Sequence, residues 1–203
     1  MSQDILYLIT ALVTSGATLS AVWLKHKLTC TDHCKVLEEE MKQNTNVYTA
    51  LEYTLAETGA DRAYVFEFHN GDHYFSGRGQ QKFSCTYEVV KEGISAESSQ
   101  SQNYRVSNFH HYIKSLIGEG HFSHDNLDSI EDYGLIKLLD HKGVQSIYNV
   151  PLKTLNGKII GLVGLDFVKN PRKGGAIGFG GNPKGHLKDL LKDQARIIAG
   201  YLV

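Results

Sequence analysis

The sequence predicts an α+β fold, in which an N-terminal transmembrane helix precedes an antiparallel sheet flanked by helices. Residues 5–24 form one uncharged and largely apolar run, and residues 26–57 follow with helical spacing and no proline. Two pairs of strand-like segments then surround two helical segments, and a further helix closes the chain, as expected of a sheet covered by helices. We therefore divide the chain into an anchor (1–25), a juxtamembrane coiled-coil-like helix (26–57) and an α/β domain (58–203).

The composition is that of an ordinary folded protein. The 203 residues include 21 basic and 22 acidic side chains, for a formal net charge of −1, and 41% of the residues are hydrophobic. A balanced charge without a basic stripe argues against nucleic acid as a partner. Three cysteines are too few for a disulfide framework in a chain of this length.

The run from Ile5 to Leu24 has the length of a membrane span, because about 20 helical residues cross a bilayer core of about 30 Å. Tyr7 and Trp23 lie near its ends, where aromatic side chains favour the membrane interfaces. Two alternatives are a cleavable signal peptide and a buried helix of a soluble protein. A signal peptide requires positive charge before the apolar run, whereas the side chains there include an acid, Asp4, and no base.

The orientation of this span follows from the basic residues around it. Lys25 and Lys27 come directly after the run, and no basic side chain precedes it. Basic residues next to a span stay on the cytoplasmic side of the membrane. We therefore expect a single-pass protein whose soluble domain is cytoplasmic.

A heptad-like pattern runs along residues 26–57. Its members are spaced alternately by four and three residues: Cys30, Cys34, Leu37, Met41, Asn44, Tyr48, Leu51 and Leu55. This alternation is typical of a coiled coil, in which Asn44 would set the register. Extended backward, the pattern includes a pair of small residues that lets membrane helices approach closely. We expect a parallel homodimer or higher homo-oligomer with a seam of Gly16, Ser20, Cys34, Leu37, Met41, Asn44 and Tyr48. The alternative is that Leu51 and Leu55 pack on the following sheet.

Beyond Gly59 the pattern changes from helical to extended. Segments rich in aromatic and β-branched residues predict strands over 62–69, 82–90, 143–154 and 158–169. The spacing of apolar residues predicts helices over 106–117, 129–141 and 184–202. The last two strands form a hairpin, and the polar segment 95–102 is predicted to be a mobile loop.

Four segments of this domain, TGADRAYVFEFHNG, FSCTYEVV, SIYNVPL and NGKIIGLVGLDF, resemble those of a GAF domain over about residues 45–203. GAF domains sense small molecules or dimerise, and their first helix often continues from a membrane helix or coiled coil. The resemblance implies a GAF/PAS-like fold and a membrane-anchored sensory or regulatory module that binds a small molecule or a protein partner. The FHNG and SCTYE segments are similar to those of a phage-encoded group, which implies phage origin and an anchor in the bacterial inner membrane.

The closing segment DQARIIAGYL and the hairpin SIYNVPLKTLNGKIIGLVGLDF carry a more distant similarity to the holins of the T-even phages. Those proteins also have one N-terminal span, a long helix and a soluble α/β domain, which lies outside the inner membrane and is bound by an antiholin. This similarity implies an alternative function, a holin that perforates the inner membrane while its soluble domain times lysis of the host cell. The chain differs from that family in lacking basic residues before the span.

A GAF-like pocket would draw its ligand contacts from polar residues on the sheet. We predict that the ligand is bound by Glu67, His69, Asn70, Tyr87, Glu88, Tyr148 and Asn149. Strand alternation places Glu67 and His69 on the face opposite Phe66 and Phe68. The alternative for each polar residue is a structural hydrogen bond or an exposed position.

The sequence carries no recognisable catalytic or metal-binding motif. Its histidine groups match no established metal spacing: His69 to His73, His110-His111, His121-x-x-His124, and His26, Cys30, His33 and Cys34. The glycine-rich tract 174–181 fits neither the P-loop nor the dinucleotide-binding pattern. Nucleophile motifs such as G-x-S-x-G are also missing from the sequence. We therefore expect a protein that is not an enzyme and uses no metal or cofactor.

Overall fold

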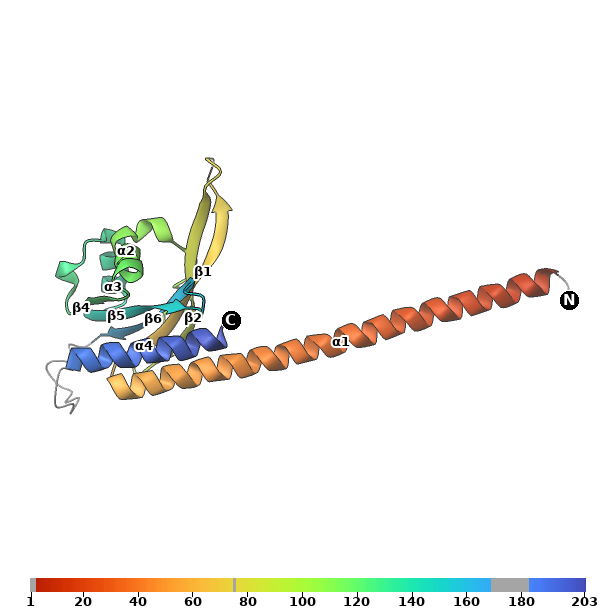
Figure 1. Cartoon of the computed structure of the whole chain (residues 1–203), viewed down its shortest axis with the longest axis horizontal. Helices are drawn as coiled ribbons and strands as arrows, with labels where there is room; N and C mark the ends of the chain where they lie inside the picture. Colours follow the sequence, from red (N-terminus) through yellow and green to blue (C-terminus); the bar gives the residue numbers. More distant parts are fainter. Residues whose placement is uncertain (1–2, 75, 169–182) are drawn as a thin grey trace. The chain divides into compact units, whose positions relative to one another are not determined.

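The computed structural model describes residues 3–74, 76–168 and 183–203, without the side chains of residues 183–184 and of several residues between 4 and 34 (Figure 1). The chain divides into two compact units, Met1–Asn44 and Thr45–Val203. Helix α1 (Gln3–Thr58) is continuous and contributes to both units. The compact globular unit therefore begins within the predicted coiled-coil segment, at Thr45.

The first unit consists of helix α1 up to Asn44. Its described side chains from residue 3 to residue 43 are exposed. Within the helix, the hydroxyl of Ser20 donates a hydrogen bond to the carbonyl oxygen of Gly16 at 2.7 Å. Among the residues whose side chains are described, no helix is long and apolar enough to cross a membrane. Residues 8–12 of the predicted span lie outside that set.

The predicted dimer seam is partly exposed and partly taken up by the chain itself. Leu37, Met41 and Tyr48 are 60%, 56% and 41% exposed, whereas the side chain of Cys34 lies outside the described ones. The next two members of the heptad pattern, Leu51 and Leu55, are buried in the core of the second unit. The exposed apolar track on α1 therefore ends at Tyr48.

The second unit is built on a six-stranded antiparallel sheet of order β3-β2-β1-β6-β5-β4. The strands are β1 (Arg62–His73), β2 (Gly79–Val90), β3 (Tyr104–Arg105), β4 (Phe122–His124), β5 (Ser146–Lys153) and β6 (Ile159–Phe167). The other elements are 3-10 turn η1 (Val106–Asn108), helix α2 (His110–Gly118), turn η2 (Leu127–Ser129), and helices α3 (Tyr133–His141) and α4 (Pro183–Tyr201). The predicted antiparallel sheet flanked by helices is confirmed.

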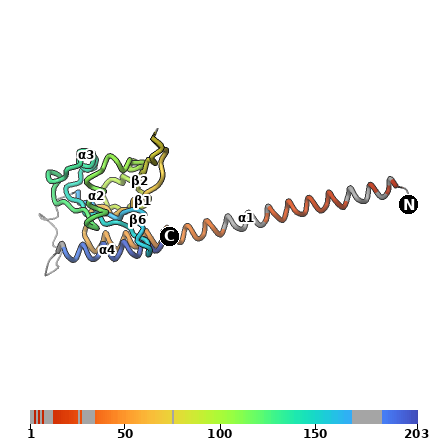
Figure 2. The backbone as a smooth tube through the Cα atoms, turned by 45° about the horizontal axis from the view of Figure 1, so that its top comes forward, coloured from red at the N-terminus to blue at the C-terminus, as the bar shows by residue number. Residues whose placement is uncertain are grey.

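The sheet separates two cores. On one face the end of α1 and helix α4 run side by side (Figures 1 and 2), and they bury Leu51 and Ile198 against Val65 of β1. On the other face α2 and α3 cover an aromatic core that includes Phe66 of β1. Central strand β6 is buried from Gly161 to Phe167 because helices cover both of its faces.

Three features of this unit differ from the prediction. Strand β1 continues to His73 and strand β2 begins at Gly79, so these two strands pair beyond Glu67, the last residue of β1 that pairs with β6. The edge strands β3 and β4 were not predicted, because two or three residues carry no detectable periodicity. The segment 95–102, predicted to be mobile, is held to the sheet by hydrogen bonds from several elements.

Candidate functional site

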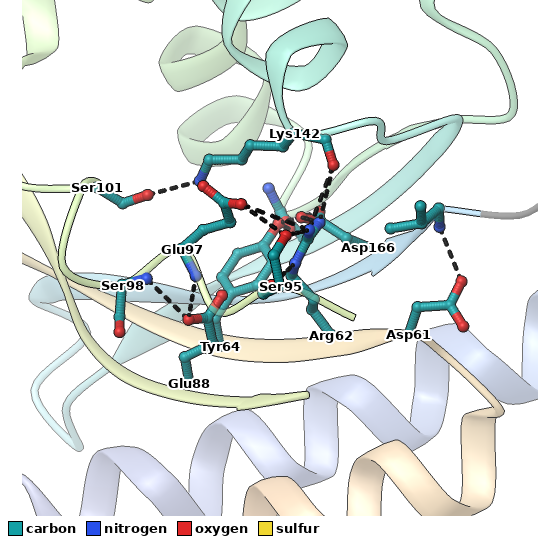
Figure 3. Close-up of polar contacts among 12 residues, drawn as sticks. Asp61, Arg62, Tyr64, Glu88, Ser95, Glu97, Ser98, Ser101, Lys142 and Asp166 are labelled. Carbon is teal, nitrogen blue, oxygen red and sulfur yellow. Dashed lines mark hydrogen bonds and ion pairs between the residues drawn. The ribbon is translucent and has the colours of Figure 1, made fainter. Parts of the chain in front are cut away.

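A buried arginine lies on the α2–α3 face of the sheet, at the first residue of β1. The side chain of Arg62 is only 2% exposed, and its Nε donates to the carbonyl oxygen of Ser95 at 2.9 Å. One terminal nitrogen donates to the Ser95 hydroxyl at 3.0 Å, and both donate to the carbonyl oxygen of Lys142 at 3.3 Å. Carboxylate oxygens of Asp166 and Glu97 lie 3.7 and 3.8 Å from the guanidinium (Figure 3). A buried cation is tolerated only with such full pairing.

A chain of hydrogen bonds connects this arginine site to helix α2. The hydroxyl of Tyr64 lies 2.8 Å from Asp166 Oδ1 and 2.9 Å from Asn149 Oδ1, and it donates to one of them at a time. The amide of Asn149 in turn donates to the hydroxyl of Tyr112 at 2.5 Å. A side chain at Gly164 would run into Asn149 and Tyr64, so glycine at this position of β6 leaves room for the chain. Strands β1, β5 and β6 are thereby linked to α2.

Burial sets the protonation of this network. It raises the pKa of Asp166 to about 6, although the hydrogen bond from Tyr64 and the charges of Lys142 and Arg62 act in the opposite direction. Burial also raises the pKa of the Tyr64 phenol, which the neighbouring charge of Asp166 raises further. Tyr64 is therefore a neutral donor at neutral pH, while Asp166 titrates in the mildly acidic range.

Residues 95–103 form a segment, here called the strap, that lies over this end of the sheet. The carboxylate of Glu88 accepts hydrogen bonds from two successive backbone N–H groups of the strap, at 2.7 and 2.8 Å. The ammonium group of Lys142 donates to the hydroxyl of Ser101 at 2.6 Å (Figure 3). Together with Arg62, these contacts tie the strap to β1, to β2 and to the residue that follows α3.

An open hollow of about 580 Å³ lies beside this network, between α2, β4 and the residues that precede α3. Two buried apolar side chains, Phe122 and Ile130, contribute to its lining. Three imidazoles also line it, those of His111, His121 and His124. Its volume lies within the roughly 300–1,000 Å³ that small-molecule sites occupy.

Asp132 connects the hollow with the buried network. It is buried in the lining, and its carboxylate accepts hydrogen bonds from the backbone N–H groups of His111 at 3.2 Å and Tyr112 at 2.6 Å. These N–H groups belong to the first turn of α2, which a negative charge stabilises. Since Tyr112 also accepts the hydrogen bond from Asn149, a displacement of the start of α2 would reach the centre of the sheet.

Only two of the predicted ligand residues lie on the α2–α3 face in the polar network. Asn149 is part of the hydrogen-bond chain, and Glu88 holds the strap. Tyr148 faces the opposite core, where burial raises the pKa of its hydroxyl to about 12. The ring of Tyr87 lies 5.4 Å from that of Tyr48 on the α1 side. The two faces of the sheet therefore divide the predicted set.

The other three predicted residues lie on the first hairpin. His69 contacts the Ser84 hydroxyl of β2 through Nε2 at 2.9 Å, Glu67 is half-buried, and Asn70 is exposed. Sequence reasoning did not select Arg62, Asp166 or any residue of the hollow as a ligand contact. The sequence did show the groups His110-His111 and His121-x-x-His124, but they were considered only as a metal site, which their spacing does not support.

Comparison with known proteins supports the fold. No family model matches the chain, and neither does any curated protein. The GAF domain of PixJ from Thermosynechococcus elongatus, in its blue-light absorbing form, is 16% identical with a TM-score of 0.57, over 81% of this chain and 89% of that one. The phycoerythrobilin-bound GAF domain of a cyanobacterial phytochrome is 13% identical with a TM-score of 0.57, over 83% and 89%. The fold is thus GAF-like, as predicted, whereas the expected phage origin and holin similarity find no support here.

The raised pKa of Asp166 makes a testable prediction about stability. Because the folded state holds the proton more tightly than the unfolded chain, this stabilisation is full below pH 4 and is lost as the pH rises through about 6. Between pH 4.5 and 7.5 the loss should be about 2 kcal/mol in the free energy of unfolding. In Asp166→Asn this change should disappear, as measured by urea unfolding at the two pH values. The exposed Asp140→Asn serves as the control, and equal pH dependence in all three proteins would contradict the prediction.

Proposed function

We propose that the chain is a GAF-type sensory or regulatory module that binds a small molecule and catalyses no reaction. The observation that carries this proposal is the hollow between α2, β4 and the start of α3, set in a GAF-like fold. The phycoerythrobilin-bound GAF domain of similar fold is a precedent for ligand binding in this architecture. The thiol of Cys85 gives no support to a catalytic role, because it is buried and its pKa is raised to about 12.

A ligand in the hollow would act through α2. Contacts with His111 and Asp132 bear on the first turn of α2, and Tyr112 passes a displacement through Asn149 to the sheet. The opposite face of the same sheet packs on α4 and on the end of α1. A ligand that favours one arrangement of α2 would therefore bias the arrangement of α1, which is the coupling a sensory module requires.

Helix α1 is the proposed output of the module. Its exposed apolar side chains Leu37 and Met41 support a parallel homodimer, because apolar residues at this heptad spacing pack against a partner helix in a coiled coil. The apolar run of residues 5–24 supports attachment to a bacterial inner membrane. The lysines that follow it favour a cytoplasmic domain.

The ligand site predicts that a compound binding in the hollow raises the melting temperature of the full chain by several degrees, because it stabilises the folded state alone. A thermal-shift screen of polar metabolites measures this effect. Ser129→Trp, which places a large side chain beside His124 in the lining, should remove the shift. Thr86→Trp, at an exposed position outside the lining, should retain it. The proposal fails if no compound acts, or if Ser129→Trp responds as the wild type does.

The dimer predicts that Met41→Lys shifts the full chain from dimer toward monomer, because a buried lysine in a coiled-coil seam is costly. Sedimentation equilibrium of the purified chain in detergent measures the change. Glu39→Lys, an exposed position off the apolar track, is the matched control and should leave the dimer intact. A wild-type chain that sediments as a monomer at high concentration would refute the proposal.

Membrane attachment and orientation are tested together by fusions after Val203 in bacteria. We expect a green fluorescent protein fusion to fluoresce in the membrane fraction and an alkaline phosphatase fusion to be inactive, since the domain would be cytoplasmic. Active phosphatase without fluorescence would place the domain outside the inner membrane and would favour a holin-type function. A fusion found only in the soluble fraction would refute the anchor.

A further inference from the structure

We propose that the ligand taken up by the hollow is an organic cation, an amine or guanidinium compound, rather than an anion, a neutral compound or a metal ion. This inference rests on the proposed function and adds the chemical class of the ligand. It follows from the hydrogen-bonding groups that line the hollow, which offer acceptors in excess of donors.

Two of the three imidazoles have their protonated nitrogen assigned by a neighbour. His121 Nδ1 lies 3.2 Å from the carbonyl oxygen of Glu119, which can only accept, so Nδ1 carries the proton. His111 Nδ1 lies 2.8 Å from the carboxylate of Glu131 and carries a proton for the same reason. In the neutral form of each ring, Nε2 then holds a lone pair and accepts hydrogen bonds.

The position of the proton on the third imidazole, that of His124, depends on the hydroxyl of Ser129. His124 Nδ1 lies 2.7 Å from the hydroxyl oxygen of Ser129. That hydroxyl has one proton, and Asn126 offers it acceptor oxygens at 3.3 and 3.2 Å. When the hydroxyl donates to Asn126, it accepts the Nδ1 proton and Nε2 of His124 is the lone-pair nitrogen; when it donates to Nδ1 instead, Nε2 carries the proton. Burial lowers the pKa of this imidazole, which keeps it neutral at pH 7.

The charged side chains of the lining also favour a positively charged ligand. Three carboxylates line the hollow, those of Glu119, Glu131 and Asp132, against the single ammonium group of Lys114. Asp132 is engaged by the backbone of α2, whereas the largely exposed carboxylate of Glu131 accepts from His111 Nδ1 and retains further lone pairs. A ligand with several N–H donors and a positive charge matches acceptors of this kind.

The apolar part of the lining suits an organic cation better than a bare ion. The ring of Phe122, which contributes to the lining, lies 4.6 Å from that of His124, so an aromatic surface borders the acceptors. Such a surface attracts cations and accommodates a hydrocarbon stem. Within the described part of the chain, no three His, Cys, Asp or Glu side chains are placed to hold one metal ion. Acceptors that are spread apart in this way fit an extended ligand.

Isothermal titration calorimetry of the full chain tests the inference with three probes built on a four-carbon chain: agmatine, 1,4-butanediol and succinate. We expect agmatine to bind at least about tenfold more tightly than the neutral and anionic probes. Glu119→Gln and Glu131→Gln should each weaken agmatine by about three- to tenfold, since each removes a charge-assisted acceptor. Lys114→Gln should tighten it, and Glu92→Gln, exposed and outside the lining, should leave it unchanged.

Several outcomes overturn the cation assignment: succinate or butanediol binding as well as agmatine, agmatine binding unaffected by both Gln variants, or Zn²⁺ alone displacing agmatine in wild type but not in His121→Ala. The failure of this inference is distinguishable from failure of the proposed function. A compound of another charge class that Ser129→Trp excludes would leave the hollow as a ligand site and refute only the cation assignment. If Ser129→Trp excludes nothing that the wild type binds, the proposed ligand site is itself refuted.

Discussion

The burial of the Arg62 guanidinium is the constraint on which the arrangement of the globular unit depends. A cation that is 2% exposed must find a partner for each of its donors, and here they come from the strap, from the residue after α3 and from β6. Removing one partner would leave a buried charge uncompensated, which typically costs several kcal/mol. The arginine at the start of β1 therefore holds together segments that are far apart in the sequence.

This constraint makes the two faces of the sheet different in kind. The face toward α1 and α4 is closed by aliphatic side chains such as Leu51 and Leu165, which have no directional preference. The face toward α2 and α3 carries the hydrogen-bonded chain from Asp166 to Tyr112, whose geometry is directional. A displacement of α2 must therefore either break or reorient these bonds. In the proposed function, this face would be the one that transmits a ligand signal.

The first helix shows how local pattern and tertiary packing compete for the same residues. A heptad repeat continues in the sequence to Leu55, but the domain buries Leu51 and Leu55 in its own core. A side chain cannot pack against its own sheet and a second helix at once. In the proposed dimer, the seam would therefore lie before that point, at residues such as Leu37 and Met41.

The sequence by itself determined the class of fold and the order of the main helices and strands, because the periodicities of helices and strands are local properties of the backbone. It also separated the two faces of β1, as with Phe66 and Glu67, but the predicted ligand set combined neighbours on opposite faces of β5, Tyr148 and Asn149. Only the tertiary structure decided which polar residues share a site. Arg62 meets Asp166 through the pairing of β1 with β6, and three histidines come to line one hollow where α2 packs beside β4. Such contacts depend on how distant segments close on one another, which no local periodicity records.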